Sequence, residues 1–125
     1  MPPPSPLPIY IWKILDSDPN PLPEGLPLSD LDRSDGFIHL STADQVPGTC
    51  DRFFSAAQTL YLLRIPLERV ESRIKWEDNS HGSFPHLYDA DLGNALGSKE
   101  VKEVVKCERG ADQGWVDVIR RAVHE

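Results

Sequence analysis

Hydrophobic residues recur along the chain in short alternating or continuous runs, a pattern that is typical of β-strands. The runs expected to form strands are Ile9–Leu15, Phe37–Ser41, Thr59–Ile65, Arg73–Glu77, Phe84–Tyr88 and Val101–Cys107. Ile9–Leu15 is apolar at nearly every position, which predicts an inner place in a sheet. Thr59–Ile65 is the most strand-like run and is predicted to be the central strand, ended by Pro66.

Two segments carry helical signals. Thr42 followed three residues later by Gln45 is a capping-box pattern, so a helix is expected to begin there, with an interruption at Pro47-Gly48. The apolar stripe that resumes at helical spacing and is predicted to face the sheet consists of Cys50, Phe53, Phe54 and Ala57. Arg52 would then lie on the flank of this helix. A second helix is predicted over Gly114–Val123.

Polar and proline-rich stretches separate these elements. Nine of the 12 prolines fall in the first 27 residues, so Met1–Pro8 is expected to form an extended leader and Asp18–Pro27 an irregular loop. The acidic stretch Asp16–Asp35 is predicted to cross the surface, and Asp78–Ser83 to be a flexible loop. The leucines expected to attach the acidic stretch to the core are Leu26, Leu28 and Leu31.

The order of these elements predicts the fold class. Short strands without the strand–helix–strand spacing of parallel sheets favour an α+β fold: a bent, mostly antiparallel, split sheet with flanking helices. A chain of 125 residues has the usual size of one domain, here residues 9–125 after the leader 1–8. The oligomeric state is left open by the pattern.

Charge and composition narrow the classes of partner. With 13 Lys and Arg against 20 Asp and Glu, the net charge of −7 disfavours nonspecific binding to nucleic acid. No apolar run reaches the roughly 20 residues that cross a bilayer, so no membrane partner and a cytoplasmic location are expected. Cys50 and Cys107 lack the CxxC spacing of redox or zinc sites and are expected to be buried thiols.

The candidate chemistry lies on two alternating strands. Period-two geometry puts Phe37, His39 and Ser41 on one face. The same geometry gives the second predicted strand a matching face of Phe84, His86 and Tyr88. Two such strands are expected to face one cleft, where imidazoles and hydroxyls can bind a ribose or phosphate or move a proton near neutral pH. Hydrogen-bonded histidines with a purely structural role are the alternative. If both histidines line a cleft, His39→Ala and His86→Ala should each weaken ligand binding more than folding.

Two further interpretations concern the residues near these histidines. Trp76 and Glu77 could stack on a planar base and accept a hydrogen bond from a sugar hydroxyl. Alternatively Trp76 faces inward, and Glu77 only pairs with Lys75 or Arg73. Three histidines can also hold zinc, but His39, His81 and His86 lack the helical HExxH spacing, so no metal is expected.

Several ordered segments resemble a known family, the proteins grouped as domain-of-unknown-function 952. The segments that carry the resemblance are Asp35–Thr42, Gln45-Val46, Asp51–Phe54, Lys75–Glu77 and Phe84–Tyr88. The likeness covers about Ile9 to Tyr88, and the tail after Asp89 is longer and more charged. That family is in turn similar to the ADP-ribosyltransferase fold, and the segment Ile38–Ser41 looks like the His-Leu-Ser segment of its RNA 2′-phosphotransferase branch.

This resemblance implies a transferase that uses NAD, or a related nucleotide, as a small-molecule substrate. His39, Glu77 and His86 are then the expected catalytic residues, with His86 or Glu77 at the reacting ribose. The residues expected to bind the nucleotide are Ser41, Thr42, Arg52, Trp76 and Tyr88, with Arg52 on a phosphate. The acidic net charge argues against a phosphorylated RNA as the substrate.

Two other classes of function remain open. The same cleft could recognise a nucleotide or modified sugar without turning it over, as a binding module. The acidic stretch Asp16–Asp35 could instead meet a basic protein partner, and such an interaction would depend strongly on salt. Turnover of NAD separates the first alternative from an enzyme.

Overall fold

The computed structural model describes residues 3–123 of the chain. Its strands are β1 (Tyr10–Leu15), β2 (Ile38–His39), β3 (Thr59–Pro66), β4 (Ile74–Asn79), β5 (Gly82–Leu87) and β6 (Glu103–Glu108). Its α-helices are α1 (Asp30–Asp35), α2 (Val46–Phe53) and α3 (Trp115–Ala122). Three short 3₁₀ turns occupy Leu67–Arg69, Glu71–Arg73 and Leu92–Asn94.

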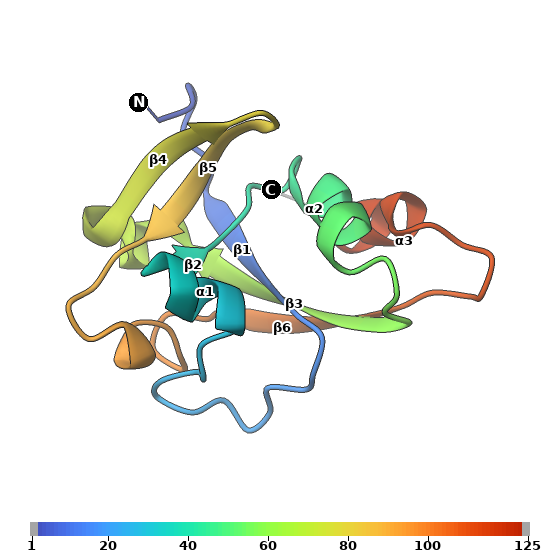
Figure 1. Cartoon of the computed structure of the whole chain (residues 1–125), viewed down its shortest axis with the longest axis horizontal. Coiled ribbons are helices and arrows are strands. Elements are labelled where there is room, and N and C mark those ends of the chain that lie inside the picture. Colours follow the sequence, from blue (N-terminus) through green and yellow to red (C-terminus); the bar gives the residue numbers. More distant parts are fainter. Residues whose placement is uncertain (1–2, 124–125) are drawn as a thin grey trace.

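The strands form two antiparallel sheets of three strands each, ordered β1-β3-β6 and β2-β5-β4. A single bridge joins them: Trp12 N donates to Ser41 O at 2.8 Å, and Ser41 N donates to Trp12 O at 2.9 Å. The β4–β5 hairpin therefore turns away from the first sheet, as Figure 1 shows. The predicted α+β class and the split antiparallel sheet are confirmed.

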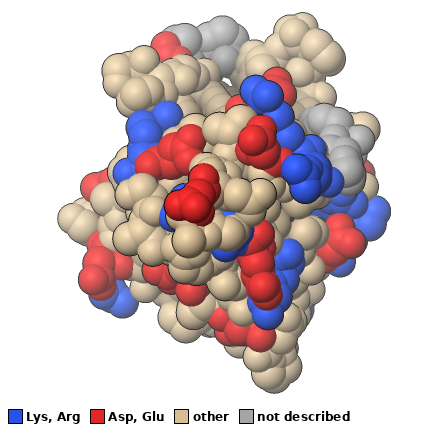
Figure 2. Space-filling view, turned by 90° about the vertical axis from the view of Figure 1, so that its right-hand side faces the viewer, with Lys and Arg blue, Asp and Glu red and all other residues tan. Residues whose placement is uncertain are grey.

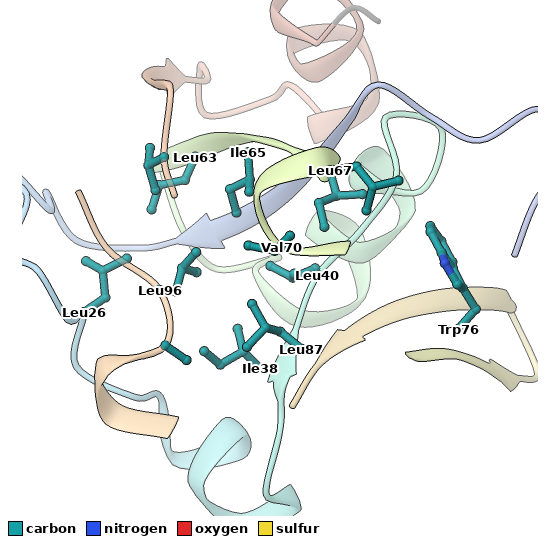
Figure 3. Packing of buried hydrophobic residues seen from close by; sticks show 13 residues of the cluster. Leu26, Ile38, Leu40, Leu63, Ile65, Leu67, Val70, Trp76, Leu87 and Leu96 are labelled. Atoms are coloured by element: carbon teal, nitrogen blue, oxygen red, sulfur yellow. The ribbon is translucent and has the colours of Figure 1, made fainter. Parts of the chain in front are cut away.

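The sheet β1-β3-β6 is buried on both of its faces, which explains why its first two strands are apolar almost throughout. Ile11, Leu63 and Ile65 face the second sheet and the long connections. Figure 3 shows this cluster from close by. The other face contributes Trp12 and Leu62 to a cluster with α2 and α3, which lie side by side in Figure 1.

Both cysteines lie in that second cluster. Cys50 comes from α2 and Cys107 from β6, and both are buried free thiols, as predicted. Burial raises the pKa of Cys50 to about 12, so its thiol stays protonated and acts as a small apolar side chain.

Several strand predictions need correction. β3 is central, as expected, but β1 is the edge strand of its sheet, and on its outer side Trp12 forms a bridge to Ser41. The polar segment Asp78–Ser83 is not a loop, because Asn79 pairs with Gly82 and only two residues form the turn of the β4–β5 hairpin. Gly82 has a φ of +128°, which other residues rarely adopt.

The helix predictions were partly wrong as well. α2 begins at Val46 and runs through Pro47-Gly48, because proline in the first helical turn lacks only an N–H that would have no helical partner. Phe53 is 63% exposed and does not belong to the stripe that faces the sheet. Helix α1 was not predicted at all. It lies in the stretch expected to be an irregular crossing, where Leu26 is buried but Leu31 is exposed.

The ends of the predicted segments lie partly outside the described residues. Outside the described residues lie Met1 and Pro2 of the predicted leader and His124 and Glu125 of the predicted domain. Residues 3–8 contain no helix or strand. On the face drawn in Figure 2, acidic and basic side chains are interspersed. Within residues 3–123 no helix is long and apolar enough to cross a membrane.

Candidate functional site

A cleft of about 680 Å³ opens where α1, α2 and the β4–β5 hairpin face one another across β1 and β2. This volume lies in the range typical of small-molecule sites. His39 and His86 both line it, together with Ser41 and Arg52. The geometric prediction that the two histidines share one cleft therefore agrees with the structure, whereas their chemical roles stay a prediction.

His39 is held by a network of charged groups that line the cleft. Its Nδ1 lies 2.6 Å from Asp32 Oδ1, and its Nε2 lies 3.0 Å from Asp35 Oδ2. Lys13 Nζ lies 2.7 Å from the other oxygen of Asp32 and donates to His39 O at 3.3 Å. His39 is therefore enclosed between two carboxylates: Asp32 is hydrogen-bonded to its ring, and Asp35 lies within ion-pair distance.

Local sequence explains why α1 presents these carboxylates. Ser29 caps the helix by accepting a hydrogen bond from Asp32 N at 3.1 Å, and Gly36 ends it in the left-handed conformation, with φ of +79°. Asp32 and Asp35, three residues apart, therefore lie on the same side of the helix. Asp32 Oδ1 also accepts the backbone N–H of His39 at 3.1 Å, which fixes β2 to the helix.

Asp32 is the buried centre of this network, with a side chain only 2% exposed. Burial alone would raise the pKa of its carboxyl group. The hydrogen bond from His39 and the charge and hydrogen bond of Lys13 outweigh that effect and lower the pKa below its usual value. Asp32 is therefore ionised at neutral pH and neutralised by its two partners.

His86 is held by one carboxylate instead of two. Its Nδ1 lies 2.8 Å from Glu77 Oε1, and the same oxygen accepts the hydroxyl of Tyr88 at 2.6 Å. The hydrogen bonds from Tyr88 and His86 lower the pKa of Glu77, and the bond to Glu77 raises the pKa of Tyr88 to about 12. An ionised Glu77 requires a proton on Nδ1, which leaves Nε2 of a neutral His86 as an acceptor.

The two imidazoles lie next to each other. His39 pairs directly with His86 in the antiparallel register of β2 and β5, and their ring centroids are 5.4 Å apart. Phe37 stacks on His86 at 4.1 Å and contacts His39 at 4.5 Å, so one ring orients both histidines. The site thus combines an imidazole held between two carboxylates with one held by a single carboxylate.

A polar row crosses the cleft toward α2. Ser41 Oγ lies 3.4 Å from Thr49 Oγ1, and Arg52 Nη2 donates to the same threonine oxygen at 3.5 Å. Thr49 and Arg52 are three residues apart on α2 and therefore project from the same side of the helix. Two hydroxyls and a guanidinium in a row can hold an anionic oxygen group such as a phosphate.

Four residues predicted for the site do not line the cleft. Thr42 serves the start of α2, where its backbone N–H donates to Gln45 Oε1 at 3.0 Å. Trp76 is 8% exposed and packs in the core, where Figure 3 shows it on the hairpin. Glu77 and Tyr88 stand behind His86, and the side chain of Glu77 is 42% exposed. None of these four residues therefore lies where it could contact a ligand bound in the cleft as the structure stands.

Sequence reasoning missed Lys13, Asp32, Asp35 and Thr49 as cleft residues. Two signals were available. Ser29 followed three residues later by Asp32 matches the start of a helix, and Lys13 is a lone charge in an apolar strand. No signal in the sequence pairs Thr49 with Ser41, because that contact depends on how α2 meets β2.

The zinc alternative gains no support from the geometry. His39, His81 and His86 all line the cleft, with His81 in the hairpin turn. Both ring nitrogens of His39 already face carboxylates. In the described part of the chain no group of three or more His, Cys, Asp or Glu residues is arranged to hold a metal ion.

Solved structures similar to this chain include those of the protein CC0527 from Caulobacter crescentus. The X-ray structure is 31% identical to this chain, covers 84% of it and 91% of its own chain, and has a TM-score of 0.68. The solution NMR structure of the same protein is 32% identical, covers 83% and 89%, and has a TM-score of 0.64. Among curated protein sequences, none matches this chain significantly.

Fold and site together define a small α+β protein with a split antiparallel sheet and a histidine-lined cleft. Residues 23–105 match the family model described as "Protein of unknown function (DUF952)". The chain belongs to this family, as the sequence resemblance implied. The match continues beyond Tyr88 to residue 105, so the expected departure after Asp89 was placed too early.

Proposed function

We propose that the cleft binds NAD or a related nucleotide and that the protein is an ADP-ribosyltransferase-like enzyme. The observation that carries the proposal is the pair of adjacent, differently held imidazoles of His39 and His86 beside the polar row of Ser41, Thr49 and Arg52. In this proposal the row holds the pyrophosphate, and the histidines meet the ribose. The sequence resemblance supports the same substrate class.

The chemistry assigned to the residues follows from their hydrogen bonds. In ribosyl transfer the bond between nicotinamide and the anomeric carbon breaks, nicotinamide leaves with the electron pair, and the acceptor's nucleophile bonds to that carbon. Nε2 of His86 takes the proton that the nucleophile loses. His39 donates from Nε2 to a ribose hydroxyl or a phosphate oxygen, which takes the place of Asp35 beside this nitrogen.

Glu77 has a different role from the one expected. Because it does not line the cleft, we assign it to positioning His86 and selecting its tautomer, instead of contacting the reacting ribose. We assign stabilisation of the developing positive charge on the ribose to Asp35, which lines the cleft and is the more exposed of the two carboxylates that hold His39.

A specific observation favours the second candidate function, a nucleotide-binding module without turnover. The carboxylates beside the histidines, Asp32, Asp35 and Glu77, are all engaged in contacts with other side chains of the protein. A transferase needs at least one of them to turn toward the ribose.

Calorimetry with NAD, followed by an assay for released nicotinamide, tests both candidates. Binding with release that His86→Ala abolishes supports the transferase. Binding without release, in the presence of a range of acceptors, replaces it with the binding module. Absence of binding of NAD and of related nucleotides such as AMP by the wild type overturns both.

A further inference from the structure

Two of the most exposed large apolar side chains lie at the same cleft. Among the described residues, Leu31 is 47% exposed and Phe53 is 63% exposed. Leu31 comes from α1 and Phe53 from α2, and both line the cleft that contains the histidines. Neither is needed by the core clusters, because neither belongs to them.

Phe53 is directly next to the polar row. It follows Arg52 in α2, and the guanidinium carbon of Arg52 lies 5.9 Å from the centroid of the Phe53 ring. In the lining of the cleft, the polar row therefore ends at Arg52, and the next residue, Phe53, presents an exposed aromatic ring. A ligand complementary to this boundary carries an anionic group beside a flat apolar ring.

We infer that Phe53 is the stacking platform for the planar base of the nucleotide, with Leu31 facing the base from α1. This inference rests on the proposed function and deepens it, because it assigns the base to a site that the sequence does not identify. Trp76, the residue expected to stack on the base, is buried in the core and does not line the cleft.

Physical reasons favour an aromatic base over other occupants. Stacking on an aromatic side chain is tolerant of the identity of the base, since every base has a π-face. The neighbouring guanidinium can add a cation–π contact and hold the first phosphate at the same time. A purely apolar occupant would leave Arg52, Thr49 and Ser41 without a function at one end of the cleft.

The test compares two ligands that differ by the base, AMP and ribose 5-phosphate, on wild type, Phe53→Ala, Phe53→Trp and the control Leu7→Ala. Leu7 is also exposed but lies outside this cleft. We expect Phe53→Ala to weaken AMP binding about tenfold, which is about 1.4 kcal/mol, and to change ribose 5-phosphate binding less than about twofold. Phe53→Trp should retain or raise AMP affinity, and Leu7→Ala should change neither.

The other outcomes are decisive as well. Equal loss for both ligands would mean that Phe53 does not contact the base. Unchanged AMP affinity in Phe53→Ala would overturn the inference while NAD binding still supported the proposed function. AMP binding that needs Phe53, without NAD turnover, would support the inference and overturn the proposed transferase activity. A change in oligomeric state in Phe53→Ala, measured by size exclusion, without a change in affinity would assign the surface to a second copy of the chain. Absence of binding of AMP, ribose 5-phosphate and NAD by the wild type overturns the inference and the proposed function together.

Discussion

His39 and His86 face each other across paired strands, but the carboxylates that hold them differ in number and in burial. His39 belongs to a network that joins β1, α1 and β2 through the buried pair Lys13 and Asp32. His86 belongs to a hairpin and depends on Glu77, a half-exposed carboxylate on the same hairpin. The same local order of aromatic residue, histidine and hydroxyl residue thus occurs in two different environments.

The difference between the two partner carboxylates predicts which histidine contributes more to stability. A charge that leaves water must be paired, so the network of His39 is part of what holds the three elements together. The carboxylate of Glu77 keeps access to water, so its loss costs little folding energy. The two histidines should therefore respond differently to the same substitution.

The largest effect is expected at Asp32. Asp32→Ala leaves the ammonium group of Lys13 buried without its partner, and removal of one partner of a buried pair typically costs about 3–5 kcal/mol. Urea unfolding should show a decrease of this size in the free energy of unfolding. Asp30→Ala on the same helix is the control, because Asp30 is exposed. Equal effects of the two substitutions would contradict the central role of the buried pair.

The next effect distinguishes the two histidines. His39→Ala removes the imidazole bond to Asp32 and should lower the free energy of unfolding by about 1–3 kcal/mol. His86→Ala should cost less stability, although the His86 side chain is only 12% exposed, because the bond that it removes joins a half-exposed carboxylate. It should reduce NAD affinity about tenfold, because Nε2 of His86 is the acceptor in the proposed reaction. The expectation that each substitution affects binding more than folding stays a prediction, and the buried partner of His39 makes it the more demanding one for His39. Paired urea titrations and calorimetry check it, and a larger stability loss for His86→Ala would reverse the assignment.

A smaller effect is expected when Glu77 is changed to Gln. The side chain keeps its shape but loses the charge that selects the proton on Nδ1 of His86. NAD affinity should fall about threefold, which is less than 1 kcal/mol, with stability nearly unchanged because Glu77 is half-exposed. NMR of the imidazole nitrogens reports the tautomer directly. An unchanged tautomer in Glu77→Gln would show that the carboxylate does not position His86.

The smallest effect is a pH dependence of stability. The folded-state pKa of Asp32 is lowered, so its contribution is present above the unfolded-state value of about 3.9 and is lost as the pH falls through the lower folded-state value. Between about pH 5 and about pH 3, the wild type should therefore lose more stability than Asp32→Asn. Urea midpoints across this range measure the difference, and parallel curves would show that Asp32 does not contribute.

Much of the fold could be predicted because it depends on local pattern. The alternating and continuous apolar runs located the strands, and the missing strand–helix–strand spacing indicated antiparallel sheets. Helix α1 was missed because six residues give too short a pattern for periodicity. Phe53 was assigned to the buried stripe because helical spacing does not show which part of a helix packs against the sheet. The β4–β5 turn was missed because polar composition alone predicts a loop.

In the site, too, local pattern predicted some features, and contacts between distant elements decided the others. Sequence alone determined that His39 and His86 project to the same side as their strand neighbours, because side-chain direction in a strand follows period two. Only the tertiary structure decided that Asp32 and Lys13 meet at His39, that Trp76 is core and that Phe53 is exposed at the cleft. These outcomes depend on contacts between elements far apart in the chain, and no local pattern encodes the distance between them.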